Sequence, residues 1–111
     1  MTKSNTEAEI SFRFNRLDKM QAFTLEREIV GSKRKDHIED HYHVVCVPLT
    51  DMSFDDINDY YVRQRVDIED CDILVSGASD SGTNVYDIPG IVNRMLKYID
   101  CKLTFSFTVV D

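Results

Sequence analysis

The sequence has no long apolar run, and its first residues lack the apolar core of a signal peptide. A transmembrane helix needs about 20 consecutive apolar residues, far more than any stretch found here. Internal repeats, low-complexity segments and linkers rich in proline and glycine are also missing. We therefore expect a cytoplasmic protein with a flexible N-terminus at residues 1–8 and a single domain over residues 9–111.

Cysteine is sparse and widely spaced. Cys46, Cys71 and Cys101 form no Cys-x-x-Cys pair, and their number is odd. Each one lies within an apolar segment or at its start, which is typical of reduced core thiols in a cytosolic protein. We therefore expect neither a disulfide framework nor a redox or metal role for these cysteines.

Positive charge is scarce beyond the first third of the chain. Residues 1–35 carry eight basic and five acidic side chains, whereas residues 36–111 carry five basic and fifteen acidic ones, and the net charge is −7. A molecule of this charge repels nucleic-acid phosphates and anionic lipids, so direct binding to nucleic acid or membrane is not expected. Fourteen of the twenty acidic residues are aspartate, which favours loops and helix ends.

Apolar spacing predicts four strands and two or three helices. The predicted strands begin at Glu9, His41, Cys71 and Lys102. Helical spacing covers residues 18–30, 54–61 and 88–99, the last with Asp87 as its N-cap. Residues 18–30 also fit a strand, but Asp18 and Gln21 resemble a capping box and favour the helix. Residues 62–68 fit either a continued helix or a strand, and the polar run 32–36 predicts an exposed turn.

The alternation of these elements predicts the fold class. Four strands separated by helices favour an α+β single-domain, two-layer sandwich. Its sheet is expected to be mostly antiparallel and four-stranded, with two or three helices, in a ferredoxin-like or related arrangement.

The histidines form the first candidate site. His37, His41 and His43 lie close together among acidic residues, and on a strand His41 and His43 would share one face. Two imidazoles in that position are candidates for metal binding. The alternative is a polar, titratable surface, which we favour because the segment lacks a thiolate pair. No cofactor is therefore expected.

The segment 76–84 forms the second candidate site, because it follows a predicted buried strand and leads towards a helix. It lacks the lysine and the glycine spacing of phosphate-binding loops, and Asp80 would repel a phosphate. It also lacks the second glycine of a nucleophile elbow. Because no nucleophile–base pair can be assigned anywhere in the chain, we do not expect an enzyme.

The third candidate is an acidic belt, in which eight carboxylates fall within residues 51–72. The spacing does not match a calcium-binding EF-hand, because Asp56 occupies the position of the required glycine. Aspartates interleaved with tyrosines are suited to binding another protein. The alternatives are a belt that is simply a solvated acidic face and aromatic residues, Phe54, Tyr60 and Tyr61, that belong to the core. The predicted partner-binding residues are Asp51, Asp55, Asp56, Asp59, Tyr60, Asp67, Glu69 and Asp70.

These features favour a non-enzymatic acidic interaction protein that binds and blocks a basic surface of another protein. One such surface is a nucleic-acid-binding site, where this protein would act as a nucleic-acid mimic. Phage-encoded inhibitors of host defence and toxin immunity proteins are of comparable size and charge. The alternative is a regulatory domain that binds a small molecule or a metal through segment 76–84 or the histidines. Pairing of two copies through the strand at 102–110 is left open.

Overall fold

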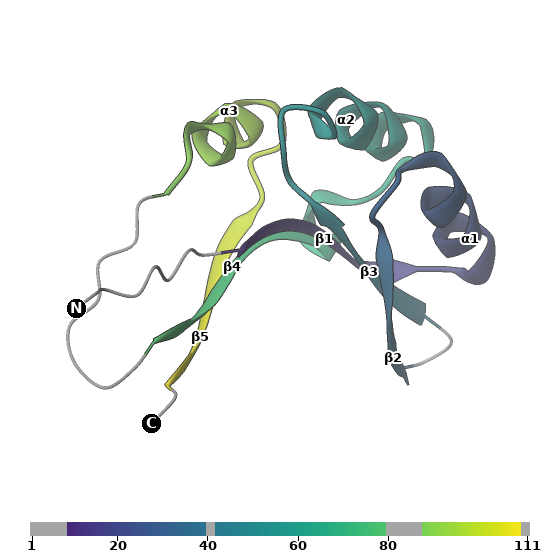
Figure 1. Ribbon diagram of the computed structural model, residues 1–111. Coiled ribbons are helices and arrows are strands. Elements are labelled where there is room, and N and C mark those ends of the chain that lie inside the picture. Colours follow the sequence, from purple (N-terminus) through teal and green to yellow (C-terminus); the bar gives the residue numbers. More distant parts are fainter. Residues whose placement is uncertain (1–8, 40–41, 80–87, 110–111) are drawn as a thin grey trace.

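The computed structural model describes residues 9–39, 42–79 and 88–109, which fold into one sheet and one layer of helices. In chain order the elements are β1 (Glu9–Leu17), α1 (Lys19–Glu28), β2 (Lys33–Glu39), β3 (Tyr42–Pro48), α2 (Phe54–Arg63), the 3₁₀ turn η1 (Ile68–Asp70), β4 (Cys71–Ser79), α3 (Gly90–Tyr98) and β5 (Lys102–Val109). All three helices lie on the same side of the sheet (Figure 1). None of the helices in these ranges has the length and apolar character needed to cross a membrane.

The sheet has the strand order β2-β3-β1-β4-β5. The pairs β2–β3, β1–β3 and β1–β4 are antiparallel, and β4–β5 is parallel. The first four strands and two helices follow the βαββαβ order of a ferredoxin-like unit. Helix α3 then crosses over to place β5 beside β4, as a parallel pair requires. The predicted α+β class is confirmed, but the sheet has five strands, not four.

The additional strand is β2, which corrects the turn predicted at residues 32–36. This segment is rich in charge and poor in apolar residues, so its composition does not indicate a strand. As an edge strand it needs a hydrogen-bonding neighbour on one side only, and it finds that neighbour in β3. Charged side chains are common on edge strands because they hinder pairing with other chains.

Local capping signals determine where α1 begins and where α2 ends. The backbone amide of Gln21 donates to Asp18 Oδ1 at 2.8 Å, and the amide of Asp18 donates to Gln21 Oε1 at 3.0 Å, so the predicted capping box is confirmed. Helix α2 stops at Arg63, and Arg65 adopts a φ of 52°, in the left-handed region. Within the stretch 62–68, Val62 and Arg63 therefore continue the helix, residues 64–67 form neither helix nor strand, and Ile68 begins η1. Asp87, the predicted cap of α3, lies outside the described residues.

The hydrophobic core fills the space between the sheet and the helices. Phe12 and Phe14 of β1 are fully buried, and the Phe14 ring meets the ring of Tyr60 edge-on at 5.2 Å. Alternate residues of the flanking strands and the inner faces of the helices complete the core: Val45, Val47, Ile73, Leu25, Ile57, Val92 and Met95. Burial of each large apolar side chain contributes about 1.5–3 kcal/mol to folding.

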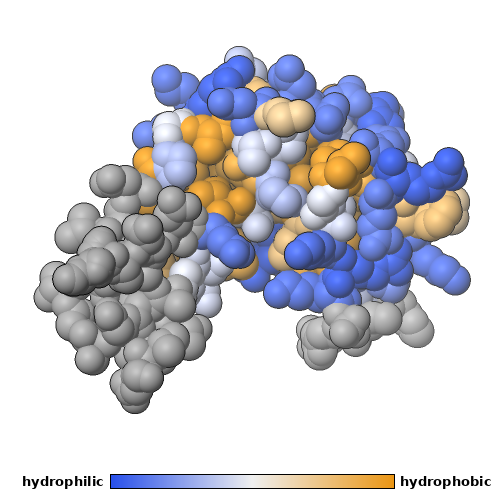
Figure 2. Space-filling view, viewed as in Figure 1, coloured by the Kyte–Doolittle hydropathy of each residue, from blue (hydrophilic) through white to orange (hydrophobic). Residues whose placement is uncertain are grey.

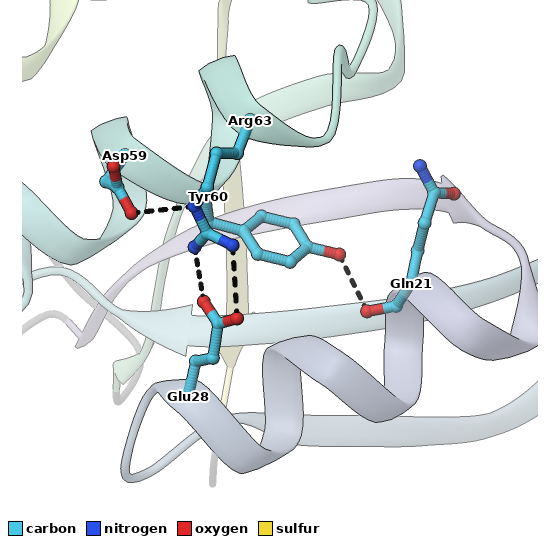
Figure 3. A network of polar contacts seen from close by, with 5 residues as sticks. All are labelled: Gln21, Glu28, Asp59, Tyr60 and Arg63. Atoms are coloured by element: carbon cyan, nitrogen blue, oxygen red, sulfur yellow. Dashed lines mark hydrogen bonds and ion pairs between the residues drawn. The ribbon is translucent and has the colours of Figure 1, made fainter.

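Polar contacts fasten α1 to α2 above this core (Figure 3). The Tyr60 hydroxyl donates to the backbone carbonyl of Gln21 at 2.7 Å. Arg63 makes two hydrogen bonds to Glu28 of α1 and one to Asp59 of its own helix. Burial raises the pKa of Tyr60, so its phenol remains a hydrogen-bond donor at physiological pH. The two helices are therefore joined by a buried bond and by an exposed ion-pair network.

The opposite face of the sheet is not covered by any helix in the described ranges (Figure 1). At its centre, Arg13 Nε of β1 donates to Asp72 Oδ1 of β4 at 2.8 Å, and a second guanidinium bond reaches Oδ2. Thr104 of β5 and Asn15 donate to the same carboxylate at 2.7 and 3.2 Å. Asp72 is only 5% exposed, so these bonds compensate for its loss of hydration and connect three strands.

We predict that Asp72→Asn lowers the stability and also makes it less sensitive to acid. Burial alone would raise the pKa of Asp72, but the bonds from Arg13, Thr104 and Asn15 outweigh it and keep this pKa below 3.8. The stabilisation is therefore complete above the ordinary aspartate pKa and is lost as the pH falls through the lower folded-state value. Urea unfolding at neutral pH should show a loss of about 1–3 kcal/mol.

Repeating the unfolding between about pH 5 and pH 2 distinguishes the contribution of Asp72 to acid sensitivity from the contributions of the other carboxylates. The difference in the free energy of unfolding between wild type and Asp72→Asn should shrink in this range. The exposed control Asp100→Asn should have nearly the same free energy of unfolding as wild type throughout. A difference for Asp72→Asn that stays constant down to the lowest pH would contradict the assignment.

We also predict that Tyr60→Phe lowers the free energy of unfolding by about 1 kcal/mol, because it leaves the Gln21 carbonyl without its donor. Tyr98→Phe is the matched control, since Tyr98 is 67% exposed and should tolerate the loss of its hydroxyl within about 0.5 kcal/mol. Denaturant unfolding of both variants makes the comparison, and equal losses would refute a structural role for the Tyr60 hydroxyl.

Candidate functional site

The outer face of α2 carries the centre of the acidic belt. Phe54, Ile57 and Tyr60 turn inwards, which leaves Asp55, Asp56 and Asp59 exposed to solvent. Asp55 and Asp56 lie in the first turn, where the positive end of the helix dipole favours carboxylates. Together with Asp51, which precedes the helix, these aspartates form what we call the α2 patch: Asp51, Asp55, Asp56 and Asp59.

Counter-charges are unevenly distributed over the α2 patch. Asp59 bonds to Arg63 at 2.9 Å, and Asp51 lies 3.7 Å from Arg94 of α3. Within the described ranges, Asp55 and Asp56 have no hydrogen-bonding or ion-pair partner for their carboxylates. Uncompensated negative charge therefore lies in the first turn of α2, where it is available to a cation from another molecule.

The remaining acidic residues of the belt lie beyond the other end of α2. Asp67 and Asp70 line a small hollow of about 230 Å³ that Arg16 and Arg65 also line. Glu69 is exposed beside them. The structure therefore divides the predicted belt into the α2 patch and a second group next to basic residues, which has less negative charge to offer a partner.

Tyr60, predicted to contact a partner, is instead a core residue. Its side chain is fully buried, and its hydroxyl is engaged by α1. The exposed apolar side chains near the α2 patch are Met52 at 90%, Val62 at 70% and Tyr98 at 67%. The Tyr98 ring meets Phe54 edge-on at 5.2 Å, which places it beside the start of α2. The sequence offers one signal for this, since Tyr98 falls off the apolar stripe of its helix.

The surface view places the charged and apolar regions relative to each other. Hydrophilic residues cover the upper side of the helical layer, and apolar residues reach the surface between that layer and the sheet (Figure 2). The α2 patch is therefore a polar surface with isolated apolar side chains, which is the usual make-up of the rim and anchors of a protein interface.

The open sheet face carries basic residues from the segment predicted to be a turn, 32–36. Lys33 and Lys35 lie on β2 and are both exposed. Lys33 pairs in register with Cys46 of β3, whose side chain lies opposite the buried face of that strand. The α2 patch and these lysines thus belong to opposite faces of the molecule, a separation that the linear charge distribution only partly indicated.

The histidine and loop candidates lie largely outside the described residues. His41 lies outside the described residues, and the position of the His37 side chain is not described. His43 lies on the core side of β3, 8% exposed, and its Nδ1 has no hydrogen-bond partner in the described ranges. No group of three His, Cys, Asp or Glu residues in those ranges is arranged to hold a metal ion. Of segment 76–84, residues 76–79 extend β4 and the rest lies outside.

The three cysteines are free thiols, and burial raises the pKa of each one. The pKa of Cys101 reaches about 11, and that of the more deeply buried Cys71 is higher still. At neutral pH all three are therefore protonated, the form that is a poor nucleophile and a poor metal ligand.

The comparisons with known proteins add no relative to this description. The chain matches no protein-family model, no curated protein and no solved structure.

Proposed function

We propose that this protein is a non-enzymatic interaction protein whose α2 patch binds a basic surface on another protein and blocks it. The observation that carries the proposal is the pair of exposed carboxylates in the first turn of α2, Asp55 and Asp56, which have no cationic partner in the described ranges. Exposed charge of this kind is available for a partner at little desolvation cost to the free protein.

The neighbouring side chains support protein as the partner. Met52 and Tyr98 are largely exposed beside the carboxylates. Methionine and tyrosine are enriched in protein interfaces because they bury a large area when they meet a partner. Cationic groups on the partner would be held by the aspartates, and these two side chains would supply the apolar contact.

The charge also bears on how the partner is found and which partner is selected. A clustered negative patch accelerates encounter with a basic surface by about 10–10³-fold and penalises acidic partners. A surface that normally holds nucleic-acid phosphates is one such basic target, since the carboxylates offer the same sign of charge. Occupation of that surface would exclude the nucleic acid.

The test is a double charge reversal, Asp55→Lys with Asp56→Lys. Immobilised wild type should retain a basic protein from lysate at low salt and release it at about 0.5 M salt, where exposed charges are strongly screened. The variant should bind the partner so identified at least about tenfold more weakly, as measured by calorimetry with the purified pair. Sparing Asp59 keeps its bond to Arg63 and so limits the effect on folding.

A second double reversal, Glu9→Lys with Asp100→Lys, is the matched control because it changes the net charge equally at exposed positions outside the α2 patch. It should keep the affinity within about threefold of the wild-type value if the patch and not the net charge binds the partner. Thermal melting should show both variants folded, with a cost of about 0.3–1 kcal/mol per reversed charge at the helix start. Equal retention by wild type and by the α2 variant would overturn the proposal.

A further inference from the structure

The open face of the sheet is hollowed where β2, β3, β1 and β4 lie side by side. The hollow measures about 400 Å³, within the range of about 300–1,000 Å³ typical of small-ligand sites. The side chains relevant to binding that line it are Glu9, Ser11, Lys33, Lys35, Cys46 and Ser76. It lies on the opposite side of the sheet from the α2 patch, so what it binds does not depend on the proposed function.

Two lysines give this hollow its charge. Lys33 and Lys35 alternate along β2, so their side chains lie on the same face, with their Cα atoms about 7 Å apart. In the described ranges neither ammonium group makes an ion pair. By contrast, four of the arginines are paired with carboxylates: Arg13, Arg34, Arg63 and Arg94.

Hydroxyl groups complete the polar lining. Ser11 pairs with Leu74 and Glu9 with Ser76 across β1 and β4, which puts Ser11 and Ser76 on the open face. Among the described residues that line the hollow, Glu9 is the only carboxylate. The neighbouring carboxylate of Asp72 is already neutralised by Arg13. Two ammonium groups, two hydroxyls and one carboxylate give a site with a net positive charge.

The overall charge of −7 does not cancel this local field. The carboxylates of the α2 patch lie beyond the sheet, the core and α2 itself, and a helix with its side chains is about 10–12 Å across. Exposed charges are largely screened beyond about 8 Å at physiological ionic strength. An anion on the open face therefore experiences mainly the two lysines and the groups beside them.

We propose that the hollow binds the phosphate groups of a small phosphorylated molecule, held between Lys33 and Lys35 with hydrogen bonds from the serine hydroxyls. Ammonium groups bind phosphates as point charges, and two of them at this spacing suit a ligand with two phosphoryl groups. Among the residues that the structure describes, no aromatic ring lines the hollow, whereas surfaces that bind single-stranded nucleic acid stack bases on such rings. The lining thus favours a small ligand over a nucleic-acid strand.

The test is a titration of the ¹⁵N-labelled protein with inorganic pyrophosphate at an ionic strength of about 0.15 M, followed by amide chemical shifts. The shifts should move for residues of β1, β2, β3 and β4 around the hollow and remain unchanged on α2. Lys33→Gln with Lys35→Gln should weaken the fitted affinity at least about tenfold. The matched control, Lys19→Gln with Lys97→Gln, removes the same charge from exposed helical positions and should bind like wild type.

The spectra of the variants report directly whether they are folded, so weak binding cannot be confused with unfolding. Shifts that occur away from the hollow, or equal affinities for the two double variants, would overturn the proposal. A parallel titration with a thymidine octanucleotide tests the other occupant. Tighter binding of the octanucleotide, with shifts extending beyond the hollow to β5, would replace the small phosphorylated ligand with single-stranded nucleic acid.

Discussion

Burial of Phe12 and Phe14 beneath the helices is the interaction on which the rest of the structure depends. Their rings lie 5.0 Å apart on the central strand, and Tyr60 packs against Phe14 from the helical layer. Because side chains alternate along a strand, this burial forces Arg13 onto the opposite face. There it meets Asp72, and the resulting bonds hold β1 and β4 together and, through Thr104, connect them to β5.

The same arrangement separates the charges of the molecule into two surfaces. Helices cover only one side of the sheet, so their outer residues carry the aspartates of the α2 patch, while the lysines of β2 remain on the uncovered side. The net charge averages over both surfaces and describes neither of them. This is why a composition that argues against anion binding as a whole is compatible with a positive hollow on one face.

The α2 patch is also coupled to the stability of the fold. Asp59 helps to hold Arg63, which bonds to Glu28 and so connects α2 with α1. Asp55 and Asp56 make no such contact in the described ranges, and they contribute to stability only through their favourable position at the helix start. The proposed recognition and the stability of the fold therefore rest on different carboxylates of a single helix, and the exposed first turn is the part that can change with little effect on the fold.

The sequence by itself determined most elements and the fold class, because hydrophobic period and capping act locally. The alternation around Phe12, the capping box at Asp18 and the helical spacing of α2 each identify an element without knowledge of its neighbours. Strand β2 escaped prediction because its pairing with β3, and not its composition, makes it a strand. Tyr60 was misplaced because helical spacing does not reveal which flank faces α1. The tertiary structure alone decided which face of the sheet is covered, since that choice depends on contacts between residues distant in the chain. The same choice placed Asp72 in a hydrogen-bonded cluster and left Lys33 and Lys35 on an open surface.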